Sequence, residues 1–132
     1  MRVAIIEDDE MIVDVLQTVL QRHGFTVSAV CNAFAARKLL PFGEIDLFVC
    51  DVHLPDGSGV ALVQEVLQGN PEGKLILMSG ALSVVDVEGL TMQNGQEIPV
   101  LQKPFLLSQF LEEVFRLCGR PEDAEAENRQ VS

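Results

Sequence analysis

The sequence is poor in positive charge, with 9 Lys and Arg against 20 Asp and Glu and a formal net charge of −11. No basic cluster is longer than Arg37-Lys38, so the basic surface that nucleic-acid binding requires is missing. We therefore expect no direct DNA binding. A multivalent cation is a better candidate partner than a polyanion.

Three further absences concern compartment and redox state. The cysteines, Cys31, Cys50 and Cys118, contain no CxxC pair and cannot all pair within the chain, which favours reduced thiols over a zinc set. Four acids at residues 7–10 interrupt the N-terminus before the apolar part of a signal peptide could form. No uncharged apolar run approaches the roughly 18 residues of a membrane span. These features predict a cytoplasmic protein without a membrane partner.

What is present is a regular alternation of two patterns over 132 residues, the length of one domain. Short apolar runs of strand length occur at 3–6, 25–30, 45–50, 75–78 and 99–102. Apolar residues recur at helical spacing at 12–20, 33–40, 62–67, 83–93 and 110–117. Asn32 and Ser108 are placed to cap the second and the last of these helices.

The alternation predicts a doubly wound α/β domain over residues 1–119, with a five-stranded parallel sheet and five helices. Strands that are apolar throughout need cover on both faces, and right-handed crossovers place helices there. Residues 120–132 carry Pro and several acids with almost nothing apolar, which predicts a flexible acidic tail. In such sheets ligands bind at the carboxyl ends of the strands.

Four of the five predicted strands end in polar or charged residues: Glu7-Asp8-Asp9, Asp51, Ser79 and Lys103-Pro104. Carboxylates that converge at one edge repel one another and need a proton or a cation, and oxygen ligands suit Mg²⁺. With a hydroxyl donor and an ammonium nearby, such a site suits a phosphoryl group in transfer. Taken alone, the acids at 7–10 also fit a solvated turn at a helix N-terminus.

These residues lie in four segments: Ile5-Ile6-Glu7-Asp8-Asp9, Asp51 followed by Leu54-Pro55-Asp56-Gly57, Met78-Ser79-Gly80, and Lys103-Pro104-Phe105. Together and in this order they resemble the receiver domain of response regulators, the phosphoacceptor half of bacterial two-component signalling. The resemblance covers roughly residues 2–119. It implies a flavodoxin-like fold with strand order 2-1-3-4-5.

The resemblance also implies a role for each site residue. Asp51 is the implied phosphoacceptor, Ser79 donates its hydroxyl to a phosphoryl oxygen, and Lys103 pairs with Asp51 and then with the phosphoryl group, from a cis bond to Pro104. The implied Mg²⁺ ligands are Asp8, Asp51, the backbone carbonyl of His53 and, through water, Glu7. Two features depart from the family pattern: Val100 stands where many members have a switching Tyr or Phe, and residues 94–99 replace the usual turn after a full helix.

A sensor histidine kinase or a histidine phosphotransfer protein is the implied phosphodonor, and a downstream protein is the implied target. Such a domain catalyses its own phosphotransfer and autodephosphorylation, which differs from the turnover of a classical enzyme. No output domain fits after residue 119, so a stand-alone receiver is expected. The oligomeric state, a homodimer included, stays open.

Three alternatives are weaker. A degenerate receiver would keep the fold and act as an interaction module without phosphorylation. A flavodoxin-like cofactor domain lacks support, because no Gly-rich phosphate loop follows the first strand and no Trp or Tyr could stack a flavin. An aspartyl-phosphate hydrolase needs a second Asp two residues after the nucleophile, where this chain has His53.

Overall fold

The computed structural model describes residues 1–39, 45–69, 72–80 and 95–120. A five-stranded parallel sheet forms its centre, in the order β2-β1-β3-β6-β7. Its strands are β1 (Arg2–Ile6), β2 (Thr26–Val30), β3 (Leu47–Asp51), β6 (Lys74–Ser79) and β7 (Val100–Gln102). This is the predicted order 2-1-3-4-5, because β6 and β7 are the fourth and fifth strands of the predicted sheet.

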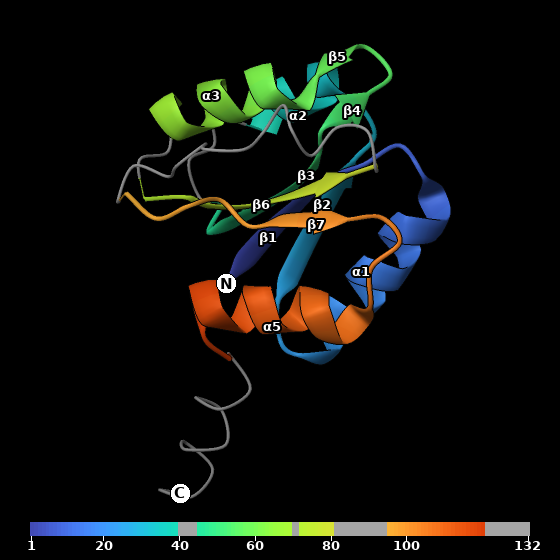
Figure 1. The fold of residues 1–132 in the computed structure, drawn as a ribbon, viewed down its shortest axis with the longest axis vertical. Coiled ribbons are helices and arrows are strands. Elements are labelled where there is room, and N and C mark those ends of the chain that lie inside the picture. The colour runs from blue at the N-terminus through green and yellow to red at the C-terminus, as the bar shows by residue number, and fades with distance from the viewer. Residues whose placement is uncertain (40–44, 70–71, 81–94, 121–132) are drawn as a thin grey trace, which may run out of the picture.

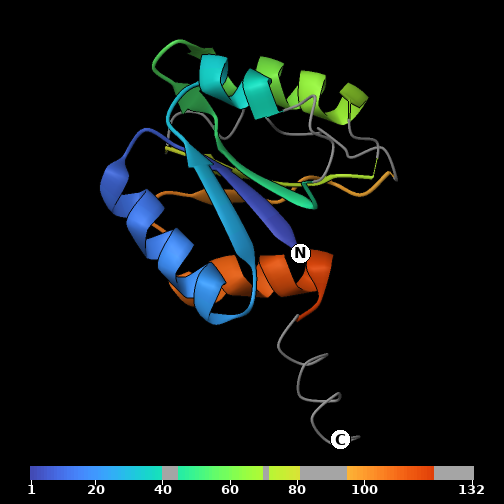
Figure 2. The same cartoon turned by 180° about the vertical axis from the view of Figure 1, so that it is seen from behind.

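Helices cover both faces of the sheet (Figures 1 and 2). On one face lie α1 (Glu10–Arg22) and α5 (Leu107–Cys118), and on the other lie α2 (Ala33–Leu39) and α3 (Gly59–Gly69). These are the four helices of the described residues. The helix predicted at 83–93 and the tail residues 121–132 lie outside them. No helix within the described ranges is long and apolar enough to span a membrane.

The core lies between the central strands and the helices. Every residue of β3 is buried, as are all residues of β1 and β6 except the first of each strand, which explains their continuous apolar composition. The edge strand β2 is mostly exposed. Each helix contributes one apolar face, and the buried helical residues include Leu16 and Leu20, Leu62, Val63 and Val66, and Phe110 and Val114.

Three local features differ from the sequence prediction. The segment after β3, predicted to be a loop, contains the hairpin of β4 (His53–Leu54) and β5 (Gly57–Ser58), whose two-residue strands are too short for a periodic signal. Ser108 does not cap the last helix, because α5 begins one residue before it. The backbone N–H of Leu106 instead donates to Gln109 Oε1 at 3.1 Å. The cap predicted at Asn32 is confirmed, since its Oδ1 accepts from Ala35 N at 2.7 Å.

Candidate functional site

The register of the sheet brings Glu7, Asp51 and Lys103 to one edge. Ile6 pairs with Cys50 across β1 and β3, so the next residues along these two strands, Glu7 and Asp51, are neighbours. The backbone N–H of Lys103 donates to the carbonyl of Ser79 at 2.7 Å, which continues the pairing of β6 with β7. Residues far apart in the sequence therefore meet because parallel strands end at the same edge.

Two carboxylates share one ammonium group at this edge. Lys103 Nζ lies 2.7 Å from Glu7 Oε1 and 3.1 Å from Asp51 Oδ2. The side chain of Glu7 is 0% exposed and that of Asp51 is 8% exposed, whereas that of Lys103 is 23% exposed. When both carboxylates are ionised, the three groups carry a net charge of −1 in a largely buried setting. Such a cluster favours a proton or a cation as a fourth member.

The pKa values show how strongly this edge resists a second negative charge. Burial, together with the neighbouring Asp51 carboxyl, raises the pKa of Glu7 from 4.5 to about 7, although the ammonium of Lys103 opposes the rise. Burial lowers the pKa of Lys103, but its hydrogen bonds to Glu7 and Asp51 outweigh that effect and the net pKa is raised. Lys103 is therefore a permanent cation, and Glu7 is the group that gains or loses a proton near neutrality.

The acidic cluster fits a hard divalent cation. Glu7, Asp8 and Asp51 each offer a carboxylate oxygen, and these atoms lie within 4.8 Å of one another. Glu7 Oε2 is buried and has no hydrogen-bond partner among the residues that the structure describes, so one buried acceptor of this side chain is unsatisfied. Asp8 is exposed and opens the cluster to solvent. Oxygen donors with access to water match the preference of Mg²⁺.

Two further predicted residues flank the cluster. The backbone N–H of His53 donates to Asp51 Oδ1 at 3.0 Å, while the imidazole is exposed. The metal contact predicted for the His53 carbonyl stays a prediction. Ser79 ends β6 next to Met78, the register partner of Asp51, and its buried hydroxyl donates to the carbonyl of Gly80 at 2.9 Å. The Lys103-Pro104 peptide bond is cis, as the resemblance implied.

The four acids at residues 7–10 divide between two tasks. Glu7 and Asp8 belong to the carboxylate cluster. Asp9 is the N-cap of α1, with Oδ1 accepting from Met11 N at 3.0 Å, and Glu10 occupies the first turn of that helix. The interpretation as a helix N-terminus is thus right for the second pair only.

Gly59 is a site residue that the sequence interpretation missed. A Cβ at this position would overlap the carbonyl oxygen of Asp51 and would lie 2.8 Å from Val52 Cα. The backbone N–H of Gly59 also donates to Val52 O at 2.7 Å. A glycine lets α3 begin directly against the backbone of Asp51. The Gly-Ser-Gly composition predicted only a loop, because close backbone approach leaves no mark in a single sequence.

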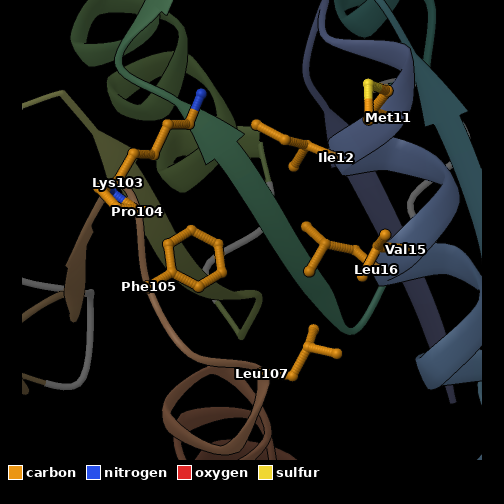
Figure 3. A pocket seen from close by; sticks show the side chains of 8 residues that line it. All are labelled: Met11, Ile12, Val15, Leu16, Lys103, Pro104, Phe105 and Leu107. Carbon is orange, nitrogen blue, oxygen red and sulfur yellow. The ribbon is translucent and has the colours of Figure 1, made fainter.

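An apolar groove of about 460 Å³ borders the cluster between α1 and the segment that follows β7 (Figure 3). Its walls include Met11, Ile12 and Val15 on one side and Phe105 and Leu107 on the other. Lys103 lines the groove as well, and its side chain extends toward the end of β3. The groove therefore leads to the charged edge of the sheet.

Residues 3–115 match the family model of the response regulator receiver domain. Among curated proteins, the chain is 32% identical over 120 residues to Protein PetR of Rhodobacter capsulatus, covering 91% of this chain and 49% of PetR. It is 28% identical over 121 residues to the transcriptional regulatory protein CutR of Streptomyces coelicolor, covering 91% and 54%. The chain spans about half the length of these relatives.

Solved structures share the fold. The signal receiver domain of a putative Luxo repressor protein from Vibrio parahaemolyticus superposes with a TM-score of 0.77 at 21% identity, covering 99% of this chain and 97% of that one. The response regulator TrrA from Thermotoga maritima, in complex with Mg²⁺ and BeF, has a TM-score of 0.72 at 22% identity, covering 88% and 97%. A Burkholderia pseudomallei response regulator with a phosphorylated aspartic acid and a calcium ion has a TM-score of 0.70 at 22% identity, covering 96% and 72%.

Proposed function

Because this chain belongs to the response regulator receiver domain family, we propose that it accepts a phosphoryl group on Asp51 with Mg²⁺ bound. The donor is a phosphohistidine on a sensor histidine kinase or a histidine phosphotransfer protein in the cytoplasm. The observation that carries the proposal is the cluster of Glu7, Asp8, Asp51 and Lys103 at the carboxyl edge of the sheet. Two solved structures of this fold hold a divalent cation, one of them with a phosphorylated aspartic acid.

The metal would be held by Asp8, Asp51 and the carbonyl of His53, with Glu7 acting through water. When bound, Mg²⁺ neutralises charge on the phosphoryl oxygens. Deprotonated Glu7 contributes negative charge to this site, so the proton that it holds near neutrality must leave as the metal binds.

The transfer itself is a substitution at phosphorus. A carboxylate oxygen of Asp51 forms the new O–P bond as the P–N bond to the donor imidazole breaks, and the imidazole keeps the electron pair. His53 N orients the Asp51 carboxylate through its 3.0 Å hydrogen bond. Lys103 exchanges part of its pairing with Asp51 for a contact with a phosphoryl oxygen. The Ser79 hydroxyl turns from the Gly80 carbonyl to donate to a second phosphoryl oxygen. Water later hydrolyses the acyl phosphate.

The groove beside Lys103 supplies a docking surface for the donor. Met11 is 79% exposed, Val15 is 48% exposed and Leu107 is 40% exposed, an unusual concentration of exposed apolar side chains. Because Lys103 lines the groove and also contacts Asp51, a donor helix seated there would bring its phosphohistidine to the nucleophile. Val15→Glu should slow transfer from a phosphorylated kinase that labels the wild type. Labelling by acetyl phosphate, which needs no docking, should be unchanged.

The signal then passes to a downstream protein. Phosphorylation would redirect Ser79 and Lys103, and with Lys103 the segment that follows β7. Val100 is half-buried on β7. Because Val has no aromatic ring, it cannot provide the shape change that a switching Tyr or Phe would provide at this position. Contact with a partner protein, rather than direct DNA binding, is the output that we propose.

Intact-mass analysis with acetyl phosphate tests the chemistry. We expect wild type to gain one phosphoryl group in the presence of Mg²⁺ and none in EDTA. Asp51→Asn should gain none, and Asp46→Asn, an exposed Asp at the opposite end of β3, should behave as wild type. A folded wild type that neither binds Mg²⁺ nor gains mass would contradict the proposal and favour the degenerate receiver.

A further inference from the structure

Asp56 connects two segments that are distant in the sequence. It lies in the turn between β4 and β5, and its carboxylate reaches the start of α2. Oδ1 accepts from Ala33 N at 2.7 Å, and Oδ2 accepts from Phe34 N at 3.0 Å. These hydrogen bonds, Ala33 first, hold the pKa of Asp56 below its ordinary value. The carboxylate is therefore ionised at neutral pH and can accept both bonds.

The contact completes the first turn of α2. Asn32 Oδ1 accepts from Ala35 N at 2.7 Å, so the backbone N–H groups of the first three residues of the helix all have side-chain acceptors. A seven-residue helix is too short to be stable alone. The position of α2 thus depends on contacts such as that with Asp56. The same hydrogen bonds hold the β4–β5 hairpin against α2.

The other end of the hairpin holds the nucleophile. His53, the first residue of β4, donates its backbone N–H to Asp51 Oδ1 at 3.0 Å and pairs with Ser58 across the hairpin. The backbone N–H of Gly59, directly after β5, donates to Val52 O at 2.7 Å. A short hydrogen-bonded ladder therefore joins Asp51 at one end to Asp56 at the other.

We propose that Asp56 is a positioning residue for the metal site. By fastening the hairpin to α2 it fixes the peptide of His53, whose N–H orients Asp51 and whose carbonyl would face the cation. Mg²⁺ tolerates little departure from octahedral geometry, so a mobile carbonyl ligand weakens binding. The inference rests on the proposed function, and it assigns part of the Mg²⁺ affinity to an exposed side chain outside the carboxylate cluster.

The test compares three variants with wild type. Asp56→Ala removes both acceptors, and Asp56→Asn keeps one. Asp46→Ala is the matched control, because Asp46 is also exposed and also accepts from a backbone amide, that of Arg2 at 2.8 Å, at the opposite end of the sheet. Mg²⁺ affinity is measured by calorimetry, and the His53 amide resonance by ¹⁵N NMR. Acetyl phosphate labelling is followed by intact mass.

We expect Asp56→Ala to lower the Mg²⁺ affinity about tenfold, the lower end of what changes behind the direct ligands cost. Asp56→Asn should lose less, and Asp46→Ala should match wild type. The ¹⁵N NMR resonance of the His53 amide should shift in Asp56→Ala. Saturating Mg²⁺ should restore the rate at which acetyl phosphate labels this variant. A purely structural loss of folded protein would not be restored in this way.

Several results would overturn the inference. Folded Asp56→Ala and Asp56→Asn with the Mg²⁺ affinity of wild type would remove the role of Asp56 and leave the proposed function intact. A loss of Mg²⁺ affinity in Asp46→Ala equal to that in Asp56→Ala would also remove the role of Asp56. If Asp56→Ala does not fold, the comparison of Asp56→Asn with Asp46→Ala decides. A wild type that binds no Mg²⁺ and takes no phosphoryl group would overturn both proposals, and the wild-type sample alone reveals that case.

Discussion

Glu7→Gln should make the metal-free protein more stable above pH 7. Glu7 is buried, and burial together with the neighbouring Asp51 raises its pKa in the folded state to about 7, against an ordinary value of 4.5. Between these two values the folded state keeps a proton that the unfolded state has lost. The free energy of unfolding that this group contributes is therefore fully present below pH 4.5 and is lost as the pH rises through 7.

The magnitude follows from the same pair of values. Each pKa unit corresponds to about 1.4 kcal/mol, so the rise from 4.5 to about 7 corresponds to roughly 3 kcal/mol lost by pH 8. A Gln side chain resembles the protonated acid: its oxygen can accept from Lys103, and its amide can donate to Asp51. The variant should thus keep at pH 8 the stability that wild type has only in acid.

Urea unfolding followed by far-UV circular dichroism measures this effect, because the chain contains no Trp or Tyr for fluorescence. The experiment runs in EDTA from pH 5 to pH 8. Glu112→Gln is the control, since this Glu is exposed on α5. The stability of wild type and of the control should fall by about 2.5 kcal/mol more than that of Glu7→Gln between pH 5 and pH 8, because a small part of the loss has already occurred at pH 5. Parallel curves for wild type and Glu7→Gln would refute the reasoning.

The metal-free fold favours protonated Glu7, whereas Mg²⁺ binding favours the ionised carboxylate. The apparent Mg²⁺ affinity of wild type should weaken about tenfold for each pH unit below 7, as expected for the loss of one proton on binding. Glu7→Gln should bind Mg²⁺ more weakly than wild type at pH 8, and its affinity should depend less on pH. Calorimetric titrations at pH 6, 7 and 8 distinguish these outcomes, and an unchanged pH dependence in Glu7→Gln would place the titrating group elsewhere.

Three other substitutions test the packing around the site and the charge of Lys103. Gly59→Ala should destabilise the fold by about 1–3 kcal/mol in urea titrations, because its Cβ would overlap the Asp51 carbonyl. Gly57→Ala is the control and should be close to neutral, because no atom lies within 4 Å of a Cβ added there. Equal losses of stability in the two variants would contradict this reason. Lys103→Met should abolish most labelling by acetyl phosphate while Mg²⁺ still binds, and full labelling would exclude an electrostatic role. Phe110→Ala should cost about 3–5 kcal/mol in the same urea titrations, because the ring is fully buried; a loss below 1 kcal/mol would mean that the core repacks.

Hydrophobic periodicity predicted the sheet because it records which faces are buried. Runs such as Val3–Ile6 and Leu75–Met78 are apolar at every position because both faces of these strands are covered. The start of α2 followed local chemistry, because its cap is the side chain of Asn32 directly before the helix. At the start of α5 the cap assigned to Ser108 was wrong, because the helix begins at Leu107 and the side chain of Gln109 accepts from the backbone N–H of Leu106.

The sequence by itself determined which chemical groups stand at the strand ends, because a polar residue after an apolar run is visible in one dimension. Tertiary structure alone decided how they interact: the pairing of Lys103 with Glu7 and Asp51, the shift in the pKa of Glu7 and the reach of Asp56 to α2. Each of these depends on distances and on burial between segments separated by tens of residues. Such quantities exist only after the strands have paired and water has been excluded from their ends.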